Sequence, residues 1–170
     1  MNLTGAAVMT MFRVSLSAIM AMLLLSLASC RTKEKTEAEN QSSVTHGRYL
    51  AVIGGCNDCH SAGYAQAEGK TDENGWLTGD RLGWNGPWGT TYPMNLRLLV
   101  SRITEEQWVR TIKNVKARPP MPWYALREMS DTDFRDLYRY IRYLGPAGVE
   151  SPAFVPPPEV PAGPVVRYPR

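Results

Sequence analysis

Apolar residues recur at helical spacing in three segments of the chain, and start or stop signals bound each segment. The first segment covers residues 44–53 and ends at the glycine pair Gly54-Gly55. The second begins at Thr104, which forms a capping-box pattern with Gln107. Its apolar face consists of Trp108, Ile112 and Val115. Both segments predict helices that bury one side.

The third segment begins after Ser130, where Asp131 and Asp133 favour a helix N-terminus. Its apolar positions are Phe134, Leu137, Tyr138, Ile141 and Leu144. The pair Gly145-Pro146 ends it. The three predicted helices lie within residues 44–147, which we interpret as one domain.

Residues 61–98 have little helical periodicity and contain many glycines and three tryptophans. Residues 76–77 and 82–84 lie between turn-forming residues and predict a short hairpin. An irregular loop of this length needs something to fold around, and a bound cofactor would supply it.

The two ends of the chain differ in composition from this domain. Residues 1–29 hold an apolar run after Arg13 that is too short for a membrane span and fits a signal peptide. The run ends in "LASC", which resembles a bacterial lipobox with Cys30 as the lipidated residue. The alternative is an ordinary signal peptide in which Cys30 is incidental. We expect an exported protein, anchored by lipid on the periplasmic side of a membrane.

Residues 30–43 are polar and predict a flexible tether between the lipid and the domain. Residues 148–170 are rich in proline, and we expect an extended tail that is draped over the domain or disordered. The net charge of +3 comes without a dense block of Lys and Arg, so nothing favours binding to nucleic acid.

The chain contains only three cysteines and two histidines, and the stretch "GCNDCH" at residues 55–60 holds three of these five. A structural zinc site needs four ligands, and His60 is poorly placed to share a metal with its neighbour Cys59. A redox dithiol is expected in a βαβ setting, which the pattern around Cys56 lacks. The third interpretation is C-x-x-C-H, in which Cys56 and Cys59 attach haem c and His60 binds the iron.

A haem iron bound by His60 needs a second axial ligand. The candidates are Met94, Met121, Met129 and, less well placed, His46. Met121 lies between prolines in "PPMPW", which hold its thioether with little loss of entropy. The alternative is that Met121 only fills the core. We predict Met121 as the ligand, with Met94 in reserve.

Five motifs follow one another in the order of a known family. They are "GRYLA" at 47–51, "CNDCH" at 56–60, "WGTTYPMNL" at 88–96, "PPMPW" at 119–123 and "SDTDF" with "LYRYI" at 130–141. This set resembles a single-haem class I c-type cytochrome domain, and is similar to the haem domains of cytochrome subunits of membrane-bound alcohol and sugar dehydrogenases. The resemblance covers about residues 44–146.

The resemblance implies an all-α fold of three to four helices around one covalently bound haem, with His60 and Met121 as axial ligands. It also implies that Gly47 lets the first helix cross closely over the last, near Tyr138 or Tyr140. With both axial positions filled, an electron carrier is expected rather than an enzyme. Its partners would be a dehydrogenase or respiratory complex as donor and an oxidase or other acceptor. The alternative is a haem enzyme or a gas or redox sensor with a displaceable sixth ligand.

Other residues of the irregular loop are weaker candidates for contact with haem. Trp76, Trp84 and Trp88 could shield the haem edge or donate to a propionate, or could simply pack within the loop. Arg97 and Arg81 could pair with propionates, although a solvated arginine is commoner. Among these we select Trp88 and Arg97 as candidate haem contacts.

Overall fold

The computed structural model describes residues 33–159 and 161–169, and the chain forms two units, residues 1–41 and 42–170. The predicted signal peptide and Cys30 lie outside the described residues. Within the described ranges, no helix has both the length and the apolar character needed to cross a membrane.

In the first unit, residues 33–41 are helical. Lys33 pairs with Glu37 at 3.9 Å and Lys35 pairs with Glu39 at 3.8 Å, which are the i,i+4 spacings that support an exposed helix. Residues 42–43 are helical as well. The structure therefore places a helix in part of the predicted flexible tether, at residues 33–43. The sequence analysis did not consider this charge spacing, and the role of residues 30–43 as a tether stays a prediction.

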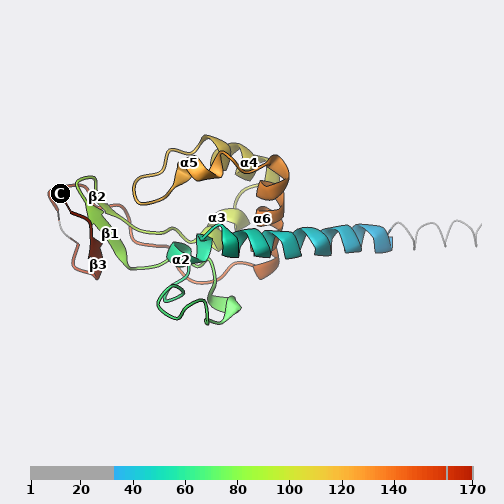
Figure 1. The fold of residues 1–170 in the computed structure, drawn as a ribbon, viewed down its shortest axis with the longest axis horizontal. Helices are drawn as coiled ribbons and strands as arrows, with labels where there is room; N and C mark the ends of the chain where they lie inside the picture. Colours follow the sequence, from blue (N-terminus) through green and yellow to red (C-terminus); the bar gives the residue numbers. More distant parts are fainter. Residues whose placement is uncertain (1–32, 160, 170) are drawn as a thin grey trace, which may run out of the picture. The chain divides into compact units, whose positions relative to one another are not determined.

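Helices are the main regular structure of the second unit (Figure 1). A helix over residues 42–53 comes first. The helices that follow are α2 (Cys56–His60), α3 (Leu96–Ser101), α4 (Glu105–Asn114), α5 (Trp123–Leu126) and α6 (Asp131–Leu144), with a 3₁₀ turn at Glu73–Gly75. The three helices predicted from the sequence are confirmed, while the short helices α3 and α5 were missed.

The predicted helix ends are confirmed by their caps. Thr104 accepts from the backbone N–H of Gln107, whose side chain accepts from the N–H of Thr104. Ser130 and Asp133 form the same reciprocal pair at the start of α6, and Gly145 ends that helix. These caps fix where α4 and α6 begin, and α6 packs against both α3 and α4.

Gly47 is the point at which the helix of residues 42–53 meets α6. A Cβ atom added to Gly47 would lie 2.0 Å from the carbonyl oxygen of Asp136 and 2.8 Å from the Cβ of Tyr140. Only glycine allows the two backbones to approach so closely. The predicted crossing near Tyr140 is confirmed.

Two strands of a small sheet lie in the irregular loop, so the second unit is mostly helical rather than purely α-helical. Strand β1 (Gly83–Gly86) pairs antiparallel with β2 (Gly89–Thr91) and parallel with β3 (Val165–Arg167). The predicted hairpin was misplaced, because residues 76–77 follow the 3₁₀ turn and are buried in the core. The third strand comes from the proline-rich tail, which the structure shows as draped over the domain rather than disordered.

Candidate functional site

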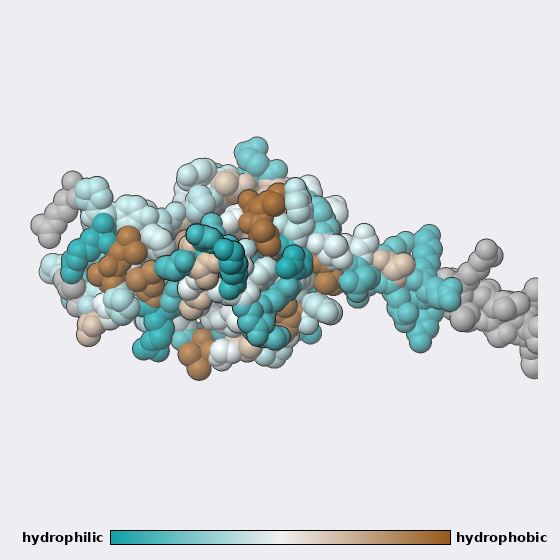
Figure 2. Space-filling view, turned by 60° about the horizontal axis from the view of Figure 1, so that its bottom comes forward, coloured by the Kyte–Doolittle hydropathy of each residue, from teal (hydrophilic) through white to brown (hydrophobic). Residues whose placement is uncertain are grey.

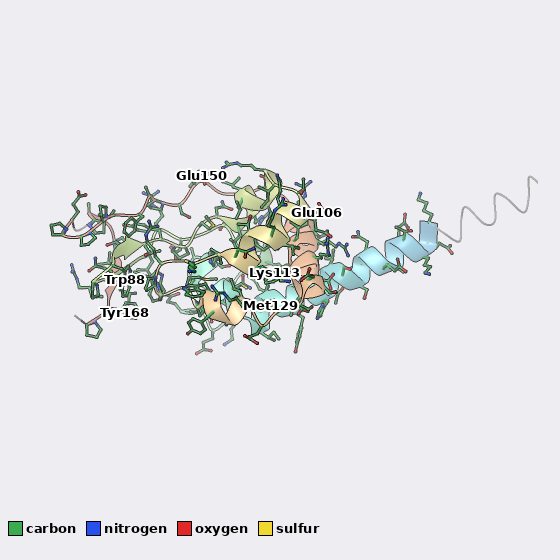
Figure 3. All side chains as sticks on the ribbon, turned by 90° about the horizontal axis from the view of Figure 1, so that it is seen from above. Trp88, Glu106, Lys113, Met129, Glu150 and Tyr168 are labelled. Atoms are coloured by element: carbon green, nitrogen blue, oxygen red, sulfur yellow. The ribbon has the colours of Figure 1, made fainter. Side chains whose placement is uncertain are left out.

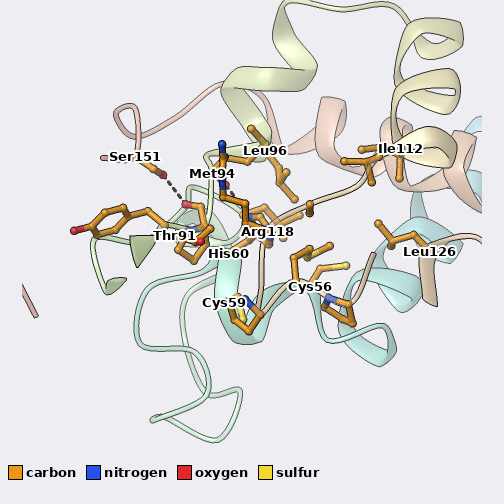
Figure 4. Close-up of a pocket in the computed structure, with 18 of the residues that line it drawn as sticks. Cys56, Cys59, His60, Thr91, Met94, Leu96, Ile112, Arg118, Leu126 and Ser151 are labelled. Carbon is orange, nitrogen blue, oxygen red and sulfur yellow. Dashed lines mark hydrogen bonds between the residues drawn. The ribbon is translucent and has the colours of Figure 1, made fainter. Parts of the chain in front are cut away.

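A cavity of about 580 Å³ lies in the second unit, between α2 on one side and α4 to α6 on the other (Figure 4). This volume is in the range of cofactor pockets. Cys56, Cys59 and His60 line it together with Met94 and Met121. The rest of the wall is mainly apolar and includes core residues of the long helices: Trp108, Ile112, Phe134, Leu137 and Ile141.

Helix α2 carries both cysteines and the histidine as a single short turn. Gly55 precedes it with a φ of 67°, a left-handed conformation that glycine adopts without strain. Both cysteines are free thiols. Burial raises the pKa of Cys56 to about 11, and burial also raises the pKa of Cys59. The two thiols are therefore protonated at neutral pH.

His60 is held in one orientation. Its Nδ1 lies 2.8 Å from the carbonyl oxygen of Met94, and because a carbonyl only accepts, Nδ1 carries the proton and donates. His60 as a residue is 8% exposed, and burial lowers the pKa of its imidazole. The imidazole is thus neutral, with Nε2 left as the nitrogen that can bind a metal.

Of the four candidates for the second axial ligand, two line the cavity and two do not. Met94 and Met121 both line the cavity. Met129 packs against the hydrophobic core instead, and His46 interacts through Nδ1 with Asp136 Oδ2 at 2.8 Å. Neither Met129 nor His46 lines the cavity.

The candidate haem contacts Trp88 and Arg97 are not among the residues that line the cavity. Trp88 lies beside Tyr168 at the sheet, with ring centroids 5.4 Å apart (Figure 3). Arg97 is buried and donates to backbone carbonyl oxygens of Gly145, Leu144 and Asn74. Of the three tryptophans considered, Trp84 is the one at the cavity, while Trp76 is buried in the core.

The sequence did not predict that the proline-rich C-terminal tail forms part of the cavity wall. Ser151 and Phe154 line the cavity, and Phe154 lies 3.9 Å below the guanidinium of Arg118, which also lines it. The tail lacks helical or strand periodicity. The one available signal was the single phenylalanine in an otherwise proline-rich stretch.

The residues that line the cavity can be compared with what the binding of haem c requires. That group needs two free thiols and an adjacent imidazole, an apolar pocket, and a soft ligand on the far side. All of these groups line the same cavity, and Nδ1 of His60 is already engaged by a carbonyl, as is usual for metal-binding histidines. Among the described residues, no cluster of three or more His, Cys, Asp or Glu side chains offers another metal site.

The chain was compared with known proteins, and a curated relative matches it. The chain is similar to the fructose dehydrogenase cytochrome subunit of Gluconobacter japonicus. The two are 26% identical over 140 residues, which cover 75% of this chain. The chain spans about a quarter (27%) of the relative's length. No family model matches the chain. No solved structure matches it either.

Proposed function

We propose that the protein is a c-type cytochrome that carries single electrons. Cys56 and Cys59 would hold one haem c by thioether bonds, and His60 and Met121 would bind its iron. The observation that carries the proposal is the cavity, which brings the C-x-x-C-H turn and Met121 to the same apolar space. The similarity to a dehydrogenase cytochrome subunit supports it.

Met121 is a better second ligand than Met94 for a geometric reason. The carbonyl of Met94 contacts Nδ1 of His60, which is the ring nitrogen away from the metal-binding Nε2. The backbone of Met94 therefore lies on the Nδ1 side of the imidazole, away from Nε2, the nitrogen that would hold the haem iron. Met94 is also 50% exposed, while Met121 is half-buried.

Two filled axial positions suit electron transfer. When bound, the haem supplies a one-electron Fe(III)/Fe(II) couple. His60 is fixed by its hydrogen bond, and Met121 is held between prolines, so neither ligand has to move when the charge on the iron changes. The mainly apolar wall of the cavity disfavours water beside a bound group. The chain then needs no catalytic residue of its own.

The location and the partners are part of the same proposal. We infer export to the periplasmic side of a membrane and lipid attachment at Cys30, on the strength of the "LASC" sequence. A dehydrogenase is the proposed donor, because the relative is named as a subunit of one. An oxidase or another respiratory complex would accept the electron.

The proposal is tested with protein made in a host that attaches haem to C-x-x-C-H. Covalent haem on the wild type, lost from Cys56→Ala/Cys59→Ala, is the expected result. Met121→Leu should abolish the near-infrared sulfur-to-iron band of the oxidised protein. Met94→Leu is the matched control and should keep it.

Two outcomes would overturn the assignment. A wild-type protein purified without haem would exclude a cytochrome. Prompt binding of carbon monoxide to the reduced wild type would show a displaceable sixth ligand, and would favour a haem enzyme or gas sensor instead.

A further inference from the structure

The tail segment of residues 147–155, which we name the C-terminal strap, is fastened to the chain on the C-terminal side of Met94. Asn95 donates from Nδ2 to the carbonyl oxygens of Ala147 at 2.8 Å and of Val149 at 3.1 Å. Asn95 is 2% exposed, and its Oδ1 also caps α3 by accepting from Leu98. The strap is therefore hydrogen-bonded to Asn95, a buried residue whose own position is set by its cap on α3.

The strap is also fastened on the N-terminal side of Met94. Ser151 donates from Oγ to the carbonyl oxygen of Pro93 at 2.6 Å (Figure 4). Thr90 and Val155 exchange two backbone hydrogen bonds, of 2.7 and 3.0 Å. The hydrogen bonds of the strap to Asn95 and to Pro93 thus flank Met94, whose carbonyl oxygen accepts the hydrogen bond from Nδ1 of His60.

Atoms are closely packed around the hydrogen bond between Ser151 and Pro93. A Cβ atom added at Gly79 would lie 2.3 Å from Ser151 Oγ and 2.9 Å from the carbonyl oxygen of Pro93. Gly79 also donates to the carbonyl of His60 at 2.8 Å. The carbonyls of His60 and Pro93 are therefore both held by direct contacts. Pro93 also accepts from the backbone N–H of Asp80 at 3.2 Å, and Ser151 supplies the side-chain donor from the strap.

We propose that the strap, through Ser151, positions the Met94 carbonyl against Nδ1 of His60 and thereby sets the reduction potential of the haem. This rests on the proposed function. A carbonyl that accepts from Nδ1 makes the imidazole a stronger electron donor, which stabilises Fe(III) and lowers the potential. Loosening the strap should weaken that hydrogen bond and raise the potential. Ser151 is then a positioning residue that does not touch the iron.

The test compares Ser151→Ala with Ser101→Ala in the haem-loaded protein. Ser101 is the matched control, because its Oγ also donates to a backbone carbonyl, that of Leu98 at 2.8 Å, but it does not line the cavity. We expect the midpoint potential of Ser151→Ala to shift upward, while Ser101→Ala keeps the wild-type value. In parallel, NMR should show faster solvent exchange of the His60 Nδ1 proton in Ser151→Ala alone.

A merely structural role for Ser151 would change thermal stability without moving the potential or the proton exchange. The proposal is overturned when Ser151→Ala and Ser101→Ala have the same potential and the same exchange rate. It is also overturned by a downward shift, which would mean that the strap acts by keeping water out of the cavity. Failure of the proposed function is visible separately, as a wild-type protein without haem.

Discussion

At the scale of single residues, Arg97 shows how a buried charge can be structural. Its guanidinium donates to three backbone carbonyls, two of them at the C-terminal end of α6. Those carbonyls are left without intrahelical partners where a helix ends. Burial lowers the pKa of Arg97, yet the group stays charged at any working pH. The arginine therefore joins α3, the 3₁₀ turn and α6.

Arg97→Leu should reduce the free energy of unfolding by about 3 kcal/mol or more, because charge-assisted hydrogen bonds are lost and buried carbonyls are left unsatisfied. Denaturant titration measures this. Arg81→Leu is the control, since Arg81 is exposed, and it should change stability by less than about 0.5 kcal/mol. Equal effects of the two substitutions would contradict the assigned role of Arg97.

The thiol of Cys56 provides a second prediction at this scale. Because the thiolate is the reactive form, the raised pKa of about 11 should make alkylation of Cys56 at pH 8 more than tenfold slower in the folded haem-free chain than in the unfolded one. A chain with Cys30→Ser and Cys59→Ser isolates the reaction of Cys56. The rate in the folded chain should keep rising up to about pH 11. A plateau near pH 9 would contradict the raised pKa of this thiol.

At the scale of elements, the sequence could predict those parts whose signals are local. The helices with caps, such as the one that begins after Ser130, depend on residues three or four positions apart. The turn of Cys56 to His60 is equally local. The sheet is different, because β1 pairs with a strand from the end of the chain and β3 has no alternating pattern. Helices α3 and α5 are shorter than the window in which periodicity can be recognised.

The candidate site likewise has parts with local sequence signals and parts that depend on contacts between distant segments. Cys56, Cys59, His60 and Met121 were selected from spacing and proline placement, and the structure brings all four to one cavity. The contact of His60 with a carbonyl at position 94, and the wall formed by the strap, depend on long-range packing that no short motif records. Trp88 and Arg97 were selected by residue type alone, and the structure gives both of them other neighbours.

The helix crossing at Gly47 gives a prediction for an element. Gly47→Ala should destabilise the protein by about 3 kcal/mol or more, because the added methyl group would overlap the backbone of Asp136 and force α6 away. Gly75→Ala is a matched control, since nothing lies within 4 Å of a Cβ at Gly75. Thermal unfolding of both variants is the measurement. Similar melting temperatures would mean that the crossing can open at little cost.

At the scale of the whole molecule, the cavity and the core share residues. Phe134, Leu137 and Ile141 belong to the buried core and also line the cavity. On the face shown in Figure 2, hydrophobic residues form separate patches among hydrophilic ones. The hydrophobic core therefore borders a space that a bound cofactor would fill.

The haem-free chain should accordingly melt at a clearly lower temperature and with a broader transition than the haem-loaded chain, since a group bound only by the native state stabilises it. Calorimetry of the two forms is the measurement, with Cys30→Ala in both to exclude effects of lipid. Retained far-ultraviolet circular dichroism would show that the helices persist without haem. Identical melting curves would contradict a core completed by the cofactor.

The strap has a consequence for the order in which the molecule is assembled. Ser151 follows Pro93 by 58 residues, and the C-x-x-C-H turn comes earlier still. A polypeptide is synthesised from its N-terminus, so Cys56 and Cys59 exist well before the segment that walls their cavity. The cavity wall that Ser151 and Phe154 supply is absent until the strap docks. We therefore expect haem to reach Cys56 and Cys59 more readily before the strap docks than after it.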